Sequence, residues 1–241
     1  MADHHGHARE LLYFPQGFDL DQSHIIQGGW PFLFPICGRL SRNGKVGQYL
    51  YEHKVYPMEI HGFAHTLKWD VTHYTENKIS LEVQNTAKTF LQYPFAFQLR
   101  LHFEIEPNHL TCVAECTNLS DKVMPYYAGY HPYFYIDPQK YHKDQVKIDF
   151  QAEQRLLYND DLTDIVGSTE TLKMPCAITS ANVNESLSLC YGSPTTNLTF
   201  PDKSLLTLSV EGEHKPQLFP YMQLYHIPKE PFFCIEHNLF I

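Results

Sequence analysis

Apolar and polar residues alternate along much of this sequence, and this alternation constrains the fold more than any other feature. From Phe97 to Ile105 every second residue is apolar, while the residues between them are polar. A period of two is typical of a β-strand with one buried face. Similar patterns occur at residues 79–84, 110–116, 146–150 and 206–210. We therefore predict an all-β protein, in which Pro107 and Asn108 turn one strand back on the next as a hairpin.

The sixteen prolines are spread along the chain and interrupt it at short intervals. Proline inside a helix removes a hydrogen bond and clashes with the preceding turn, so long helices are disfavoured. Short helices are expected at residues 141–144 and 160–165. Because 43% of the residues are hydrophobic and no break in composition marks a boundary, we predict a single domain over residues 1–241, a large antiparallel β-sandwich. Residues 1–9 are expected to be a flexible tail.

Charge and composition exclude several classes of protein. The chain has 18 Lys and Arg against 27 Asp and Glu, a formal net charge of −9, which argues against a nucleic-acid partner. No apolar run approaches the ~20 residues that span a bilayer, and the first residues lack the features of a signal peptide. The six cysteines form no CxxC pair, so free thiols are expected. We predict a cytoplasmic protein with no membrane contact.

Four segments interrupt the alternation and concentrate glycine, proline, histidine and aromatic residues. They are residues 28–40 (GGWPFLFPICGRL), 58–65 (MEIHGFAH), 129–134 (GYHPYF) and 232–238 (FFCIEHN). His61, His131 and Glu236 supply two imidazoles and a carboxylate, the groups that general acid–base catalysis requires. Aromatic rings beside a polar group suit a sugar, whose C–H faces stack while its hydroxyls need directed partners. The spacing alone leaves open whether the four segments meet in space.

The order and spacing of these four motifs resemble those of the aldose 1-epimerase (galactose mutarotase-like) family. The first motif is most similar to a branch of aldose epimerase-like proteins in which it reads LFPIxGRL. The likeness runs from about Glu10 to the C-terminus, although residues 135–209 match only as generic strands. The resemblance implies a β-supersandwich whose broad concave face binds a pyranose.

The resemblance also implies a catalytic role for three residues. By motif position, Glu236 is the base that takes the proton from the anomeric hydroxyl, and His131 is the acid that protonates the ring oxygen. His61 orients and polarises the sugar near that oxygen. The ring then opens to the free aldehyde, the C1–C2 bond rotates, and closure gives the other anomer.

Further residues of the same motifs are expected to contact the substrate. Arg39 falls on the family's substrate-binding arginine, and Trp30, His65 and Tyr133 are expected beside the sugar. His65 stands where many members have arginine, which argues against a preference for an anionic substrate. The resemblance implies no metal or organic cofactor, because ring opening requires only proton movement. The expected partner is a small-molecule sugar, and the protein is expected to be a monomer or a homodimer.

Two family features are not found where they are expected. Many members hold the sugar hydroxyls with an aspartate on a middle strand, and Asn182 or Asn184 would substitute for it here. Members also usually carry further strands before the position of Glu10 and after that of Ile241. A missing strand would leave a sheet edge that must be covered, shortened or paired.

Three other functions remain open from the sequence. A hexose-6-phosphate mutarotase would need a cationic pocket, which Arg39, Arg42 and Lys45 could supply, although residues 41–45 are more simply read as a solvated hairpin turn. A non-catalytic sugar-binding or regulatory protein would keep the aromatic pocket without turnover. The third is a metal-dependent β-barrel enzyme. Its ligands would be His61, His65, His131 and Glu236.

Overall fold

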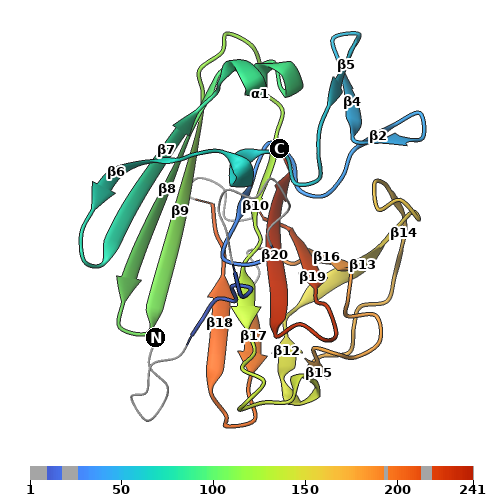
Figure 1. The fold of residues 1–241 in the computed structure, drawn as a ribbon. Coiled ribbons are helices and arrows are strands. Elements are labelled where there is room, and N and C mark those ends of the chain that lie inside the picture. The colour runs from blue at the N-terminus through green and yellow to red at the C-terminus, as the bar shows by residue number, and fades with distance from the viewer. Residues whose placement is uncertain (1–9, 18–26, 193–194, 213–218, 241) are drawn as a thin grey trace. The chain divides into compact units, whose positions relative to one another are not determined.

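The computed structural model of the protein describes four stretches of the chain: residues 10–17, 27–192, 195–212 and 219–240. The chain divides into two compact units (Figure 1). Unit 1 contains Phe34–Tyr126, and unit 2 contains Glu10–Leu33 and Tyr127–Ile241. The predicted tail, residues 1–9, lies outside the described residues. The single domain over residues 1–241 stays a prediction.

Unit 1 is built on an antiparallel sheet in which successive strands are neighbours. Within residues 34–126 the sheet runs β6 (Asp70–Tyr74), β7 (Lys78–Gln84), β8 (Phe97–Glu106) and β9 (His109–Asn118). Two hairpins precede it: β2 (Ser41–Arg42) with β3 (Lys45–Val46), and β4 (Gln48–Tyr51) with β5 (Lys54–Pro57). The β8–β9 hairpin, drawn in green in Figure 1, confirms the strands and the turn that the alternation predicted.

The core of unit 1 is aromatic. Phe34 is completely buried, and its ring lies 5.0 Å from Phe97, 5.7 Å from Tyr93 and 6.2 Å from Phe63, centroid to centroid. Such tilted and edge-on contacts suit the quadrupoles of the rings. Phe34 belongs to the first motif and Phe63 to the second, so this packing fixes the two motifs against each other.

The helix α1 (Ala87–Gln92) was not predicted from the sequence. It is six residues long, too short to reveal a helical period. Its start is fixed by a capping box, in which the Thr89 amide donates to Thr86 Oγ1 at 3.2 Å and the Thr86 amide donates to Thr89 Oγ1 at 2.8 Å. This reciprocal pair satisfies two backbone donors that a helix terminus otherwise leaves unpaired.

Unit 2 contains two antiparallel sheets. In its described part the larger sheet runs β1 (Phe32–Leu33), β10 (Tyr127–Tyr130), β20 (Phe232–Phe240), β19 (Tyr221–Tyr225), β16 (Ser186–Cys190), β13 (Ala152–Tyr158) and β14 (Ile165–Thr169), with β11 (Tyr133–Tyr135) also on β20. The smaller sheet runs β15 (Cys176–Ala177), β12 (Lys147–Asp149), β17 (Thr195–Thr199) and β18 (Leu205–Ser209). β12 and β18 confirm the strands predicted at residues 146–150 and 206–210.

The two sheets of unit 2 pack face to face. One buried cluster joins Ile148 and Leu198 of the smaller sheet to Met222 and Ile235 of the larger sheet. A shared core between two antiparallel sheets defines a β-sandwich. The predicted fold class, an all-β antiparallel sandwich, is confirmed.

Of the two short helices predicted in unit 2, one is close to a helical turn and the other is absent from its predicted residues. A single 3₁₀ turn occupies Lys143–Gln145, close to the predicted residues 141–144. The helix predicted at residues 160–165 is wrong, because this segment is a turn that leads into β14. The Asn159 side chain explains the turn, since its Oδ1 accepts hydrogen bonds from the amides of Thr163 and Asp164.

Two further expectations concern thiols and membranes. The six cysteines lie in the described residues, and none of them forms a disulfide there, as predicted. In the stretches that the structure describes, every helix is too short or too polar to cross a membrane.

Candidate active site

Strand β20 carries Glu236 on the face opposite to the sandwich core. Successive side chains of a strand point to opposite faces. Phe233 and Ile235 belong to the core between the two sheets, whereas Phe232 and Cys234 pack with Tyr133 on the other face. Glu236 has the parity of Cys234 and therefore lies on that second face.

His131 and Glu236 are in direct contact. The Nε2 atom of His131 lies 3.2 Å from Oε1 of Glu236. Both side chains are buried, with 5% and 3% of their surfaces exposed. The backbone of His131 is fixed where β10 ends, because its amide donates to the Pro31 carbonyl oxygen at 3.0 Å. An imidazole and a carboxylate at this distance can pass a proton between them.

Aromatic rings fix the orientation of His131. Its ring stacks on Tyr133 with centroids 4.6 Å apart and planes within 5°, and Tyr225 approaches edge-on at 6.3 Å. Trp30 lies in the same unit, edge-on to Tyr130 at 6.3 Å. Unit 2 thus brings His131, Tyr133 and Glu236 together. The ring of Trp30 contacts Tyr130 on β10.

Burial dominates the electrostatics of Glu236. Removal from water raises the pKa of this carboxyl group well above its usual range, and the negative charge of Glu185 raises it further. A protonated His131 would oppose both effects, because a cation at 3.2 Å favours the carboxylate. A carboxylate with a raised pKa is a stronger base than one in water, as proton abstraction from a hydroxyl requires.

Two residues that sequence reasoning missed lie beside Glu236. Gln223 is its cross-strand neighbour on β19, and Gln223 Nε2 donates to Glu185 Oε2 at 3.0 Å. Gln223 Oε1 is buried and has no hydrogen-bond partner among the described residues. The sequence offered one sign of Glu185: it is an acidic residue immediately before the alternating strand β16. Asn184, one of the two predicted substitutes for the family aspartate, instead accepts a hydrogen bond from the His226 amide at 2.8 Å.

Unit 1 holds the other predicted residues. His61 has a positive φ of 63° and is followed by Gly62 at 70°. A Cβ on Gly62 would collide with the carbonyl group of Phe34, so only glycine fits. The 3₁₀ turn Ala64–Thr66 then carries His65.

The charges of Arg39 and His65 act on His61 in unit 1. Burial lowers the pKa of His61 to about 4, and the positive charges of His65 and Arg39 act in the same direction. Burial also lowers the pKa of His65, against the opposing effect of Glu59. His61 is therefore neutral at physiological pH. His65 Nδ1 is buried without a hydrogen-bond partner in the part of the chain that the structure describes.

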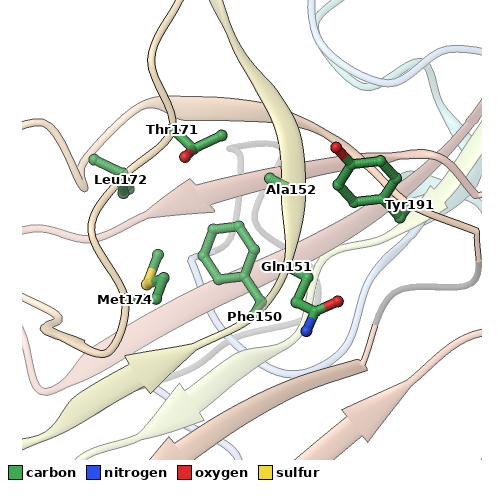
Figure 2. A pocket seen from close by; sticks show the side chains of 7 residues that line it. All are labelled: Phe150, Gln151, Ala152, Thr171, Leu172, Met174 and Tyr191. Carbon is green, nitrogen blue, oxygen red and sulfur yellow. The ribbon is translucent and has the colours of Figure 1, made fainter.

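A pocket of about 220 Å³ lies elsewhere on unit 2 (Figure 2). Its walls are Phe150, Gln151, Ala152, Thr171, Leu172, Met174 and Tyr191. None of these residues belongs to the predicted site. Its volume is also below the roughly 300 Å³ at which ligand pockets usually begin.

Comparison with known sequences identifies the family. The sequence model of the family described as aldose 1-epimerase matches residues 4–221 of this chain. The chain belongs to the aldose 1-epimerase family. The family match contains His61 and His131 and ends before Glu236, so the placement of Glu236 beside His131 comes from the structure.

One curated protein and two solved structures illustrate what this chain is similar to. The chain is 28% identical to protein LacX of Lactococcus lactis subsp. lactis over 123 residues, which are 47% of this chain and only 40% of LacX. The crystal structure of the Slr1438 protein from Synechocystis sp. PCC 6803 has a TM-score of 0.75 and 26% identity, covering 95% of this chain and 73% of that one. A galactose mutarotase related enzyme from Lactobacillus acidophilus has a TM-score of 0.74 and 23% identity, covering 87% and 70%. The predicted galactose mutarotase-like fold is confirmed.

Proposed function

We propose that this member of the aldose 1-epimerase family interconverts the α and β anomers of an aldohexose by acid–base ring opening, without a cofactor. The observation that carries the proposal is the buried contact of 3.2 Å between His131 Nε2 and Glu236 Oε1. The cytoplasm as its compartment, a small-molecule sugar as its partner, and a monomer or homodimer as its assembly belong to the same proposal.

The proposed reaction conserves protons over one cycle. Glu236 removes the proton from the anomeric hydroxyl, the C1=O bond forms, and the C1–O5 bond breaks as His131 protonates O5. Rotation about C1–C2 and the reverse steps give the other anomer. After opening, Glu236 holds the proton and His131 has lost one, and the return steps restore both. The direct contact between the two groups offers a second path for this reset when the site is empty.

Substrate contacts are proposed on both units. In unit 2, Glu185 and Gln223 offer acceptors for sugar hydroxyls beside Glu236, and the rings of Tyr133 and Trp30 offer apolar faces. In unit 1, Arg39, His61 and His65 form the second group of contacts. The support for this second group is its motif position in the family and the electrostatic effect of Arg39 and His65 on His61.

A neutral sugar fits these residues better than a sugar phosphate. Glu185 and Glu236 are two acidic groups close enough that the charge of Glu185 raises the pKa of Glu236, and carboxylates repel a phosphate dianion. Arg42 and Lys45 belong to the β2–β3 hairpin, the turn that was predicted at residues 41–45, and its central residues Asn43 and Gly44 have positive φ. Rates on glucose and on glucose 6-phosphate distinguish the two substrates, and the proposal expects the faster rate on glucose.

Polarimetry tests the proposed activity directly. Freshly dissolved α-glucose and α-galactose change their optical rotation slowly, and purified protein is expected to accelerate at least one of these changes in proportion to its concentration. The control is an equal amount of heat-denatured protein. A purely sugar-binding protein would leave the spontaneous rate unchanged, and that result would refute the proposal. Acceleration that a chelator abolishes and added metal restores would instead favour the metal-dependent alternative.

A further inference from the structure

Gly38 and His61 exchange two hydrogen bonds in unit 1. The Gly38 amide donates to Nδ1 of the His61 ring at 3.1 Å. In return, the His61 amide donates to the Gly38 carbonyl oxygen at 2.8 Å. Gly38 has a φ of 81°, so both bonds depend on a left-handed backbone conformation in the first motif. The loop that carries Arg39 is therefore joined to the histidine of the second motif.

The direction of the first bond determines where the hydrogen of the His61 ring lies. A backbone amide can only donate, so the ring nitrogen that faces it must offer a lone pair. A neutral imidazole has one N–H and one lone pair, which leaves the hydrogen on Nε2. Protonation of Nδ1 would bring two N–H groups face to face at 3.1 Å, so the Gly38 amide also disfavours the imidazolium.

We infer that Gly38 is a positioning residue that holds His61 as a neutral imidazole with its hydrogen on Nε2. His61 then acts as a hydrogen-bond donor to a sugar oxygen and does not serve as the acid, a role that is left to His131. The second part of this inference rests on the proposed function, in which His61 contacts the substrate.

The surroundings of His61 act in the same direction as the Gly38 amide. Burial and the positive charges of His65 and Arg39 favour the neutral ring of His61. At His65 burial likewise lowers the pKa, and the negative charge of Glu59 acts against it. A neutral imidazole can stabilise developing negative charge on an oxygen through its N–H group without taking part in proton transfer. With His61 as a hydrogen-bond donor and His131 as the acid, the proposed site has one acid rather than two.

Nuclear magnetic resonance of the full chain tests the tautomer without any assay of activity. In ¹⁵N-labelled protein, two-bond ¹H–¹⁵N correlations distinguish the two neutral tautomers and the imidazolium, and His61→Gln assigns the resonances of His61. We expect Nδ1 of His61 to be unprotonated and Nε2 to be protonated from pH 5 to pH 8. A hydrogen on Nδ1, or titration of His61 within that range, would overturn the inference.

A comparison of substitutions tests the role as a donor. Glutamine can place an N–H group near the position of His61 Nε2, whereas alanine cannot. Loss of one preorganised donor costs roughly 10²-fold or more, so His61→Ala is expected to lose about that much kcat/KM, and His61→Gln at most about a tenth of that factor. The same pair at His131 should show no such rescue, because glutamine cannot act as an acid.

The tautomer measurement and the substitution series distinguish failure of this inference from failure of the proposed function. Equal losses in His61→Gln and His61→Ala, together with a shifted pH profile, would refute the role as a donor. Absence of mutarotation in the parent protein would refute the proposed function, while the measured tautomer would still decide whether Gly38 positions His61.

Discussion

The Nε2 atom of His131 lies 3.2 Å from Oε1 of Glu236, in a buried setting where an aromatic ring fixes the plane of the imidazole. The backbones of both residues are held by one sheet, because β20 carries Glu236 and pairs with β10, which ends at Tyr130 next to His131. This pair is the basis of the first two predictions.

Removal of the charge on Glu236 should abolish most of the activity. Glu236→Gln keeps the size of the side chain but cannot accept the proton, so a loss of about 10²- to 10⁴-fold in the enzyme-catalysed mutarotation rate is expected. Polarimetry measures the rate, and thermal unfolding checks the fold. Glu104→Gln is the matched control, since Glu104 is paired with Lys78 on unit 1 and lies outside the proposed site. Parental activity in Glu236→Gln would contradict the assignment of the base.

Glu185 should set the position of the acidic limb of the pH profile. Its charge raises the pKa of Glu236, and the base must be ionised, so activity falls as the pH falls through that pKa. Glu185→Gln removes the repulsion and should move the acidic limb to lower pH. The profile of kcat/KM reports this value for the free enzyme.

Glu153→Gln is the control for this shift, because Glu153 is an exposed residue of β13 in the same unit. An acidic limb that stays in place in Glu185→Gln, or that moves equally in Glu153→Gln, would contradict the predicted coupling.

His237 should make the protein sensitive to acid. Its ring is buried, neither nitrogen has a partner among the described residues, and burial lowers its pKa to about 3. Below the unfolded value of about 6.5 the unfolded chain takes up a proton that the folded chain does not, so stability falls as the pH falls. Protonation of His237 in the unfolded chain should lower the free energy of unfolding by about 2 kcal/mol between pH 7 and pH 5.

Urea unfolding at pH 7 and pH 5 measures the effect of His237. The substitution His237→Leu keeps an apolar group of similar size and removes the titration, so its loss of stability over this interval should be smaller by that amount. Identical pH dependence of the parent and variant would show that His237 is not protonated differently in the folded and unfolded chains.

Gly38 and Gly62 provide a matched pair for backbone strain. Both have a positive φ, 81° and 70°, but a Cβ at Gly38 would meet open space, whereas one at Gly62 would meet the Phe34 backbone. Gly38→Ala should therefore cost about 1 kcal/mol of unfolding free energy, and Gly62→Ala roughly 1–3 kcal/mol more because of overpacking. Urea unfolding of both variants measures this difference, and equal losses would contradict the close approach.

Sequence predicted the parts of the fold that local patterns determine. Alternation of apolar and polar residues predicted β8 and β9, and the sequence of residues 41–45 predicted the β2–β3 turn. Each of these features depends only on residues a few positions apart. The helix α1 was not predicted, because it is too short to show an apolar period and its capping box is formed by two threonines.

The candidate site could be proposed from the sequence only where motifs mark it. His131 and Glu236 were found through short segments of unusual composition, and their contact within unit 2 supports pairing them. Gln223 and Glu185 were missed because their position beside Glu236 follows from the β19–β20 register and from a side-chain bond across 38 residues. A one-residue change in that register would turn Gln223 to the other face, and no local pattern specifies it.

Strand β20 presents a carboxylate on one side and the hydrophobic interior of unit 2 on the other. A substitution beside Glu236 on this strand therefore disturbs buried packing, at Ile235 in the core between the sheets and at Cys234 in the cluster with Phe232 and Tyr133. If the proposed activity is tuned by substitution, the changes should accumulate in the loops and on β19 rather than on β20. For the same reason, heating should not produce an intact sandwich with a disordered Glu236, since the two would be lost in a single cooperative transition.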